Sequence, residues 1–291
     1  MKKNKKLVIV LISILLTVIA VTVFVVMRNK KDTQNSEEQE GESLAFGVWW
    51  WDDELENEKY LNFAKQNGIS EIYYCDSSFD ENTKEFLSLA KTKKIDVYLL
   101  AGEKEWLLDK TNLDLLISRY KIFQEQNKDI KFKGIHLDIE PHQFSDFDEK
   151  RNEYILKLID LANYLKTNYT QILFDYDIPF WLNDKIVFGL ENKEAFKYMI
   201  DFANRVFVMS YRDTAEKIYN VGKDEVEYAE SVGKDLFLCV ETHSSEGDQV
   251  SFEEEGKLVM NQEIQKLRNI IGSNHGIAVH HIKTWQELKE S

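Results

Sequence analysis

Residues 134–142 have the sequence Gly-Ile-His-Leu-Asp-Ile-Glu-Pro-His, and the alternation in this stretch is the strongest indication of the fold. Side chains along a β-strand alternate between two faces, so His136, Asp138 and Glu140 share one face and the aliphatic residues share the other. The aliphatic face suits contact with helices, whereas the charged face points into a barrel. The pattern therefore predicts a barrel strand with Glu140 at the mouth of the barrel.

Short apolar runs of this kind recur eight times, and each is followed by an amphipathic helical pattern. The predicted strands are 44–50, 70–75, 95–100, 132–139, 171–177, 205–211, 235–241 and 276–282. The predicted helices are 54–67, 80–93, 109–128, 146–168, 191–203, 222–232, 252–271 and 283–290. Gly68, Gly233 and Gly272 follow three of these helices, as glycines commonly do at helix C-termini.

Strict alternation of strand and helix predicts parallel strands joined by right-handed crossovers. Eight such units over residues 44–291 match the usual size of a closed (β/α)8 barrel, also called a TIM barrel. A doubly wound open sheet is the alternative, but it would normally carry a glycine-rich phosphate loop after its first strand. Residues 47–51, Gly-Val-Trp-Trp-Trp, are not such a loop. We therefore predict an α/β fold with one barrel domain at 44–291.

The N-terminal part of the chain predicts a membrane anchor. Residues 7–27 are uncharged, and at about 1.5 Å per residue they span the roughly 30 Å core of a bilayer. Basic residues flank this run, and their excess before it favours a barrel outside the cell. A cleaved signal peptide is the alternative, but its apolar region is usually about 7–15 residues and ends in small residues. We predict a single-pass transmembrane helix within an anchor at 1–31, an acidic polar linker at 32–43, and an extracytoplasmic barrel at the cell membrane.

Charge and cysteine content restrict the partners and cofactors. Without residues 1–31 the chain has 30 basic and 51 acidic residues, a net charge of −21, which predicts no binding to nucleic acid. An extracellular domain can oxidise a cysteine pair. However, Cys75 and Cys239 lie in separate strand-like runs, which favours two buried free thiols. The sequence has no Cys-x-x-Cys metal pattern, and we expect no metal and no cofactor.

Other predicted strands also end in polar side chains. They supply Asp175 and Asp177 from the fifth strand, Tyr211 and Arg212 from the sixth, Glu241 and His243 from the seventh, and His280 and His281 from the eighth. So many buried charges are costly unless they are paired or functional. A satisfied internal network that ties the strands together is the structural alternative. It fits His136 and Asp175 best, because they lie deepest in the predicted barrel.

The tryptophans give an independent indication of the ligand. All six lie at or just beyond predicted strand ends, and they are Trp49, Trp50, Trp51, Trp106, Trp181 and Trp285. Flat amphipathic rings around a carboxylate-lined mouth suit stacking on the faces of sugar rings. For Trp50 and Trp285 the alternative role is to fill the barrel. We predict that the substrate-binding residues are these six tryptophans together with Asp177, Arg212, His243 and His281.

Residues 134–140 resemble the fourth-strand signature of the family-18 chitinases and their relatives, which ends in Asp-x-Glu with a glycine upstream. Residues 209–211, Met-Ser-Tyr, resemble the sixth-strand Met-x-Tyr of the same superfamily. The resemblance implies that Glu140 is the general acid. It also implies that Asp138 orients the acetamido group of a substrate and that Tyr211 forms a hydrogen bond with that group.

The chain also departs from that family. The family has Asp at the positions of Lys133 and His136, and Asp or Asn at the position of Arg212. The eighth-strand Trp of the family corresponds to a position near His280 or His281. A second resemblance is to retaining glycosidases with catalytic glutamates at the ends of strands four and seven. It implies that Glu140 is the acid/base and Glu241 the nucleophile, with carboxyls about 5–5.5 Å apart. Ile139 stands where that clan usually has Asn.

Three functions therefore remain open. The leading prediction is an extracytoplasmic glycoside hydrolase, or a relative of one, that acts on a cell-wall or surface polysaccharide. Its catalytic residues would be Glu140, Asp138, Glu241 and Tyr211. The second is a non-catalytic carbohydrate-binding barrel. The third is a metal-dependent hydrolase, and its candidate zinc ligands are His136, Asp138, Glu140, His142, His243, His280 and His281. Against this alternative, the first strand lacks the His-x-His pair that barrel metallohydrolases share.

Overall fold

A computed structural model describes residues 45–52, 56–184, 187–188, 192–244, 247 and 249–291 of the protein. Within these residues, no helix combines the length and the apolar character needed to cross a bilayer. The predicted anchor at 1–31 and the predicted linker at 32–43 lie outside the described residues.

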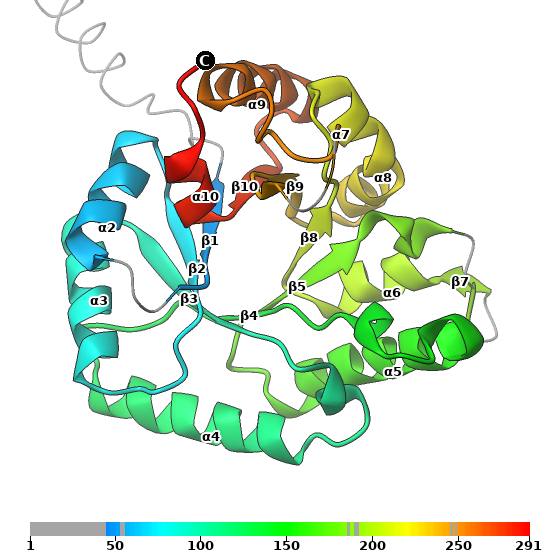
Figure 1. Cartoon of the computed structure of the whole chain (residues 1–291). Helices are drawn as coiled ribbons and strands as arrows, with labels where there is room; N and C mark the ends of the chain where they lie inside the picture. Colours follow the sequence, from blue (N-terminus) through cyan, green and yellow to red (C-terminus); the bar gives the residue numbers. More distant parts are fainter. Residues whose placement is uncertain (1–44, 53–55, 185–186, 189–191, 245–246, 248) are drawn as a thin grey trace, which may run out of the picture. The chain divides into compact units, whose positions relative to one another are not determined.

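Eight parallel strands close into a barrel, which confirms the predicted fold. The ring closes where β1 pairs with β10, and the order around it is β1, β10, β9, β8, β5, β4, β3 and β2. The strands are β1 (Phe46–Trp50), β2 (Glu71–Tyr74), β3 (Asp96–Ala101), β4 (Ile135–Leu137), β5 (Phe174–Pro179), β8 (Arg205–Met209), β9 (Leu236–Glu241) and β10 (Gly276–His280). Figure 1 shows this central ring with the helices around it.

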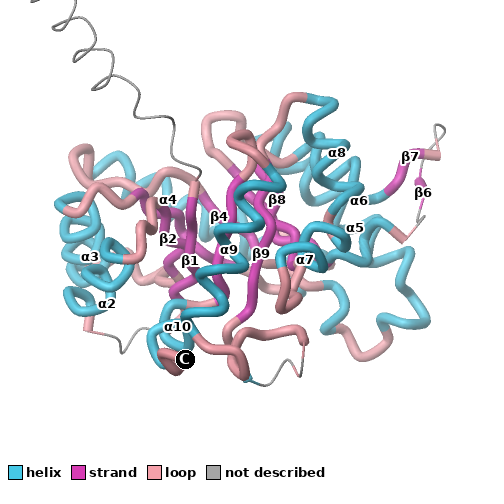
Figure 2. Tube along the Cα trace, turned by 90° about the horizontal axis from the view of Figure 1, so that it is seen from above, coloured by secondary structure: helices cyan, strands magenta, loops and turns pink. Residues whose placement is uncertain are grey.

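Helices cover the outside of the strands, as Figure 2 shows from a second direction. They are α2 (Asn57–Gln66), α3 (Glu81–Thr92), α4 (Thr111–Gln126), α5 (Phe147–Asn168), α6 (Ala195–Phe202), α7 (Ala215–Val221), α8 (Lys223–Val232), α9 (Lys257–Ile271) and α10 (Ile282–Glu287). Short 3-10 helices follow β3, β4 and β5, and they are η1 (Lys104–Leu107), η2 (Pro141–Gln143) and η3 (Phe180–Asn183). Two features were not predicted: helix α7, and the antiparallel pair β6 (Val187–Phe188) and β7 (Lys193–Glu194) between β5 and α6.

Local sequence explains several helix boundaries. The carboxylate of Asp80 accepts hydrogen bonds from the N–H groups of Asn82 and Thr83, and this capping box begins α3. Gly233 ends α8 in the left-handed conformation, with φ of 67°, which a residue with a Cβ adopts at a cost. Gly272, with φ of 70°, ends α9, as its position in the sequence predicted.

Alternation along the strands produces two separate cores. Outward-facing side chains such as Val48, Ile135 and Leu137 pack against the helices. Inward-facing aromatic side chains, among them Tyr73 and Phe207, fill the barrel itself. The barrel is therefore a packed core, and a ligand can enter only at its ends.

Arg205 closes the end of the barrel at which the strands begin. Its guanidinium donates to Asp175 Oδ2 at 2.6 Å and to both oxygens of Glu71 at 2.9 Å. The same group lies over the ring of Tyr98, with its Cζ 4.5 Å from the ring centroid. The buried charges at this end are thus paired, and Asp175 has the structural role that its depth suggested.

Candidate active site

The other end of the barrel gathers carboxyl groups from three strands. Asp138 and Glu140 follow β4, Asp177 lies near the end of β5, and Glu241 is the last residue of β9. The backbone of Asp138 still belongs to the sheet, because its N–H donates to the carbonyl of Ala101 at 3.1 Å. The predicted alternation is correct, since His136 and Asp138 face inward while Ile135, Leu137 and Ile139 belong to the outer core.

Gly102 fixes the backbone on one side of Asp138. A Cβ at position 102 would lie 1.7 Å from the carbonyl oxygen of Asp138 and 2.4 Å from its carbonyl carbon. Any side chain here would therefore push the ends of β3 and β4 apart. The glycine allows the close approach that sets the position of Asp138.

Asp138 and Asp177 are carboxyl groups with incomplete pairing. Oδ1 of each is buried and has no hydrogen-bond partner in the structure. Burial, followed by the charges of Asp177 and Glu140, raises the pKa of Asp138 well above its usual value. Burial also raises the pKa of Asp177 well above its usual value, although the indole N–H of Trp49 opposes the shift. These carboxyls therefore keep a proton to higher pH than an isolated aspartate does.

His136 and Trp49 support Asp177 from below. Trp49 Nε1 donates to Asp177 Oδ2 at 3.2 Å, and His136 Nε2 lies 2.8 Å from the same oxygen. Burial lowers the pKa of His136 to about 3, so the ring is neutral at physiological pH. Stacking on Tyr73, with ring centroids 4.2 Å apart, holds the imidazole in place. His136 and Trp49 thus position a carboxyl, and neither is placed to contact a sugar.

Glu241 is a tightly held carboxylate. It is 1% exposed, and its Oε1 accepts hydrogen bonds from the N–H groups of Thr242 at 2.7 Å and His243 at 2.8 Å. Its Oε2 lies 2.8 Å from His280 Nδ1. Both oxygens are therefore occupied, an arrangement that suits a positioning group better than a nucleophile free to attack an anomeric carbon.

Tyr211 lies beside this cluster. Its ring stacks on that of His280, with centroids 6.1 Å apart. Burial, then the charges of Glu241, Cys239, Asp177 and Asp138, raise the pKa of Tyr211 well above its usual value of 10. The phenol is therefore protonated and can donate a hydrogen bond to a ligand in the mouth.

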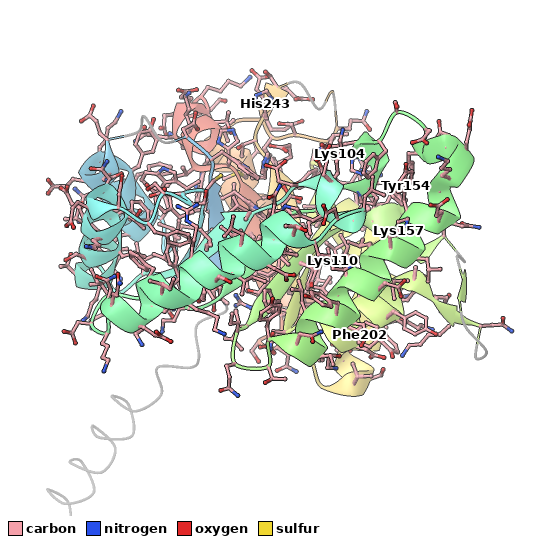
Figure 3. The ribbon with its side chains drawn as sticks, turned by 90° about the horizontal axis from the view of Figure 1, so that it is seen from below. Lys104, Lys110, Tyr154, Lys157, Phe202 and His243 are labelled. Carbon is pink, nitrogen blue, oxygen red and sulfur yellow. The ribbon has the colours of Figure 1, made fainter. Side chains whose placement is uncertain are left out.

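The loop after β4 holds Glu140 in an accessible position. Its carboxyl is 23% exposed, lies 3.5 Å from His142 Nε2, and accepts a hydrogen bond from Gln143 Nε2. The loop is anchored on two sides, because Lys104 donates to the carbonyl of Gln143 at 3.0 Å and Phe144 stacks on Tyr154. Figure 3 labels Lys104 and Tyr154, which come from η1 and α5.

A cavity of about 660 Å³ begins at the ends of β1, β2 and β3 and reaches α4. Trp51, Cys75 and Gly102 line it on the side of the barrel mouth, and Trp106 and Arg119 line it farther out. We call this cavity the aromatic groove. Its size fits a small ligand or part of a longer one. Cys75 is partly exposed here rather than buried as predicted, whereas Cys239 is buried; neither forms a disulfide.

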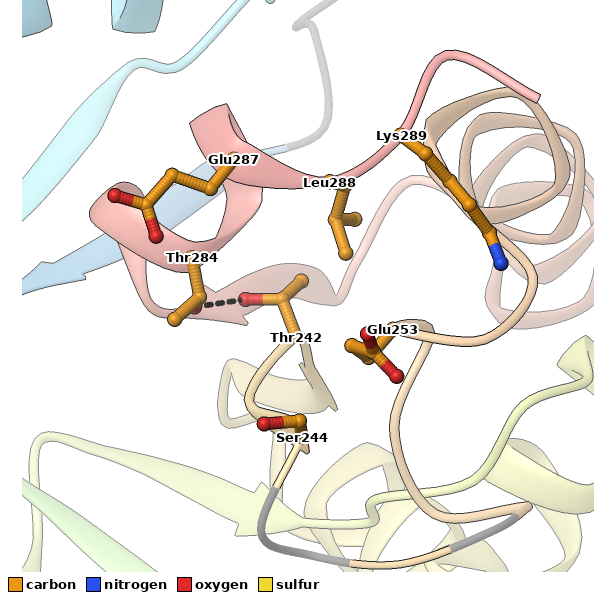
Figure 4. A pocket seen from close by; sticks show the side chains of 7 residues that line it. All are labelled: Thr242, Ser244, Glu253, Thr284, Glu287, Leu288 and Lys289. Atoms are coloured by element: carbon orange, nitrogen blue, oxygen red, sulfur yellow. Dashed lines mark hydrogen bonds between the residues drawn. The ribbon is translucent and has the colours of Figure 1, made fainter.

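A second cavity, of about 330 Å³, lies beside the end of β9 (Figure 4). On its wall the hydroxyl groups of Thr242 and Thr284 are 2.6 Å apart, and Thr242 Oγ1 also donates to the carbonyl of His280 at 2.9 Å. These bonds tie β9 to β10 directly behind the pair Glu241 and His280. The threonine pair therefore helps to keep that carboxylate and imidazole together.

Two of the predicted sugar-binding tryptophans face away from the mouth. Trp50 is 1% exposed and packs between β1 and the outer helices, with its ring 4.9 Å from that of Phe86. Trp285 is also 1% exposed, and its ring lies 5.2 Å from Phe63 and 5.7 Å from Phe46. Both belong to the outer core and stabilise the fold, so their assignment to substrate binding was wrong. They do not fill the barrel either.

Four other predicted binding residues follow the carboxyl ends of strands, and they are Trp181, Arg212, His243 and His281. Trp181 is half-buried beside His142 and carries the guanidinium of Arg151, whose Cζ is 4.8 Å from the ring centroid. Arg212 lies over Phe180 and donates to the carbonyl of Tyr211 at 2.6 Å. The ring of His243 is 6.1 Å from that of His281, whose pKa burial and His280 lower to about 4.

His280 is the site residue that the sequence prediction left out of the binding and catalytic sets. It follows Gly276 and Ala278 on the inner face of β10, and the alternation that identified Asp138 would have found it. All six histidines are in the described part of the chain, and no group of three or more His, Cys, Asp or Glu side chains there is arranged to hold a metal ion.

Solved structures provide the comparison with known proteins. A chitinase from Bacteroides thetaiotaomicron matches with a TM-score of 0.54 and 10% identity, over 83% of this chain and 90% of that chain. The Bacillus cereus spore cortex-lytic enzyme SleL matches with a TM-score of 0.50 and 11% identity, over 84% of this chain and 73% of that chain. The chain therefore shares the (β/α)8-barrel fold of these two enzymes. No protein-family model and no curated protein matches the sequence of the chain.

Proposed function

We propose that the protein is an extracytoplasmic glycoside hydrolase that cleaves a cell-wall or surface polysaccharide, with Glu140 as the general acid. One observation carries the proposal. The Oδ1 atom of Asp138 is buried and unpartnered, and this carboxyl lies within electrostatic reach of Asp177 and Glu140. A group of repelling carboxyls at a barrel mouth is costly for stability, and its use is to hold and move protons.

Glu140 is the member of this group that a substrate can reach. In the proposed reaction its carboxyl donates a proton to the glycosidic oxygen as the bond to the anomeric carbon breaks. The resulting carboxylate then takes a proton from the water that completes hydrolysis. His142 and Gln143 lie on the same short loop and orient the carboxyl throughout.

The geometry favours assistance by the substrate over attack by Glu241. Both oxygens of Glu241 are engaged, whereas Asp138 has a free oxygen and Tyr211 a phenol beside it. In this version an acetamido carbonyl oxygen of the substrate attacks the anomeric carbon. Asp138 accepts a hydrogen bond from the acetamido N–H, and Tyr211 donates one to its oxygen. The expected substrate is therefore a glycan that contains N-acetylated sugars.

The proposed localisation rests on the sequence alone. The uncharged run at 7–27 would anchor the chain, and the linker at 32–43 would give the barrel short reach from the membrane. The expected result is that the protein sediments with membranes and that protease added outside intact cells removes the barrel. Recovery of the barrel in a protected cytosolic fraction would contradict this part of the proposal.

The test of the function uses the full chain in detergent, a panel of peptidoglycan and surface glycans, and the variant Glu140→Gln. The amide keeps the shape of the carboxyl but has no proton to give, so we expect turnover to fall about 10²–10⁴-fold while glycan binding remains. Glu153→Gln, on the exposed face of α5, is the matched control and should retain full turnover.

Two outcomes would change the conclusion. Equal turnover by the wild type and Glu140→Gln would exclude Glu140 as the acid. Binding without turnover by both proteins would instead support the carbohydrate-binding alternative. This alternative is supported by His136, Arg212 and His280, which stand where the family-18 chitinases have other residues.

A further inference from the structure

Three residues from three strand ends form a continuous hydrogen-bonded chain at the mouth. Trp51 Nε1 lies 2.9 Å from His280 Nε2, and His280 Nδ1 lies 2.8 Å from Glu241 Oε2. The backbone N–H groups of Thr242 and His243 hold the other oxygen of Glu241. The chain therefore runs from a rigid carboxylate, through an imidazole, to an indole that lines the aromatic groove.

The donors and acceptors in this chain define one protonation state. An indole N–H can only donate, so His280 Nε2 must accept and carry no proton. The proton of the ring then resides on Nδ1, from which it is donated to Glu241. The arrangement is therefore that of a neutral His280, and a second proton on the ring would set two N–H groups against each other across 2.9 Å.

We propose that Glu241 and His280 position the Trp51 ring as a sugar-stacking wall of the aromatic groove, and that they do so only while His280 is neutral. The inference rests on the proposed function in one respect, namely that the ligand of the groove is a glycan. His280 acts through Trp51 and is a positioning residue. A fixed indole lowers the entropy lost on binding, whereas a released one must be ordered again by the ligand.

Charged and titratable groups surround His280 on every side. Glu241 approaches from β9, Asp138 from the end of β4 and Asp177 from β5, while Tyr211 stacks on the ring and His281 follows it in the chain. Burial lowers the pKa of His280, but the hydrogen bond to Glu241 and the negative charges of Glu241, Asp138 and Asp177 outweigh it. The pKa of His280 therefore lies above the usual 6.5. The neutral form of His280 gains population as the pH rises through this raised pKa. Glycan affinity should follow the same direction.

The first measurement needs no glycan. In the full chain in detergent, with tryptophan labelled at the indole nitrogen, the Trp51 resonance is assigned by its loss in Trp51→Phe. We expect this resonance to titrate with pH in the wild type, to lose that titration in His280→Gln and to keep it in His281→Gln. In Trp51→Phe the neutral form of His280 loses its bond from the indole, so its pKa should rise by about 0.5–1 unit. A Trp51 resonance that does not titrate would overturn the inference.

The second measurement is the glycan dissociation constant as a function of pH. For the wild type we expect it to increase by about 3- to 10-fold as the pH falls through the pKa of His280. Trp51→Phe and His280→Gln should bind more weakly at high pH and lack that step. Unchanged pH dependence in both variants would contradict the proposed positioning.

The two proposals can fail separately. If glycans bind but the Trp51 resonance ignores His280, the positioning inference is wrong and the proposed function stands. If the resonance titrates with His280 but no glycan binds, the proposed function is wrong, and with it the role of Trp51 as a sugar-stacking wall.

Discussion

Both ends of the barrel interior contain buried carboxyl groups, but the side chains that pair with these groups differ. Where the strands begin, Asp175 and Glu71 share the guanidinium of Arg205, which is permanently positive. Where the strands end, the partners are imidazoles: His136 for Asp177, and His280 for Glu241. The low pKa of His136 means that this partner brings no positive charge at neutral pH.

The difference separates a structural site from a candidate functional one. At the strand beginnings the positive charge of Arg205 pairs with two carboxyl groups and opposes burial, which raises the pKa of Asp175. At the strand ends burial leaves Asp138 and Asp177 with raised pKa values, at a cost in stability. The strand beginnings therefore hold the barrel together, and the strand ends are where proton transfer can occur.

The largest expected effect is on stability, at the paired end. Arg205→Met leaves the buried Asp175 and the partly buried Glu71 without a cation, and we expect it to lower the free energy of unfolding by about 3–5 kcal/mol. Urea unfolding followed by circular dichroism measures this change. Lys133→Met removes a half-exposed ion pair with Asp96 and should cost less than about 1 kcal/mol. If both variants lost the same free energy of unfolding, the ion pairs of Arg205 would be no more important for stability than a surface ion pair.

Adjacent tryptophans test which side of β1 faces the ligand. Trp50→Ala opens a hole in the outer core and should lower the free energy of unfolding by about 3–5 kcal/mol while glycan affinity stays the same. Trp51→Ala should do the reverse, with a smaller loss of stability and weaker glycan binding. The measurements are unfolding and glycan-binding titrations on both variants. If Trp50→Ala weakened glycan binding in protein that is still folded, the assignment of Trp50 to the outer core alone would be wrong.

Gly102→Ala tests how closely the mouth depends on the position of Asp138. The added methyl group collides with the Asp138 carbonyl, and we expect a loss of stability of about 1–3 kcal/mol. Turnover should fall as well, because displacement of Asp138 disturbs the carboxyl cluster. Gly68→Ala places its methyl group in open space, so it should change stability through its positive φ but leave turnover intact.

Sequence periodicity was sufficient for the barrel and for the inward orientation of His136 and Asp138, since both depend on local alternation. The same rule separates Trp50 from Trp49 and Trp51, but the shared residue type suggested a common role. Contacts between distant strands were not predictable in this way. Arg205 reaches Glu71 across 134 positions of sequence, and Trp51 reaches His280 across 229. Such pairs require knowledge of how the ring closes.

Helix α7 and the pair β6 and β7 were missed for related reasons. Residues 215–221 form a short helix separated from α8 only by Gly222, so the two helices look like one broken pattern in the sequence. The pair β6 and β7 has two residues in each strand, too few to show a period. Tertiary packing decides both features.

The most direct test of the account is the difference in free energy of unfolding between Asp138→Asn and the wild type, measured from about pH 4 to about pH 8. The folded state binds the Asp138 proton more tightly than the unfolded state does, because the pKa is raised above its usual 3.8. The wild type therefore loses stability as the pH rises through the folded pKa, and the uncharged amide does not. We predict that Asp138→Asn gains on the wild type with increasing pH. A difference that stays constant, or that turns against the amide at high pH, would show that the mouth carries no uncompensated charge.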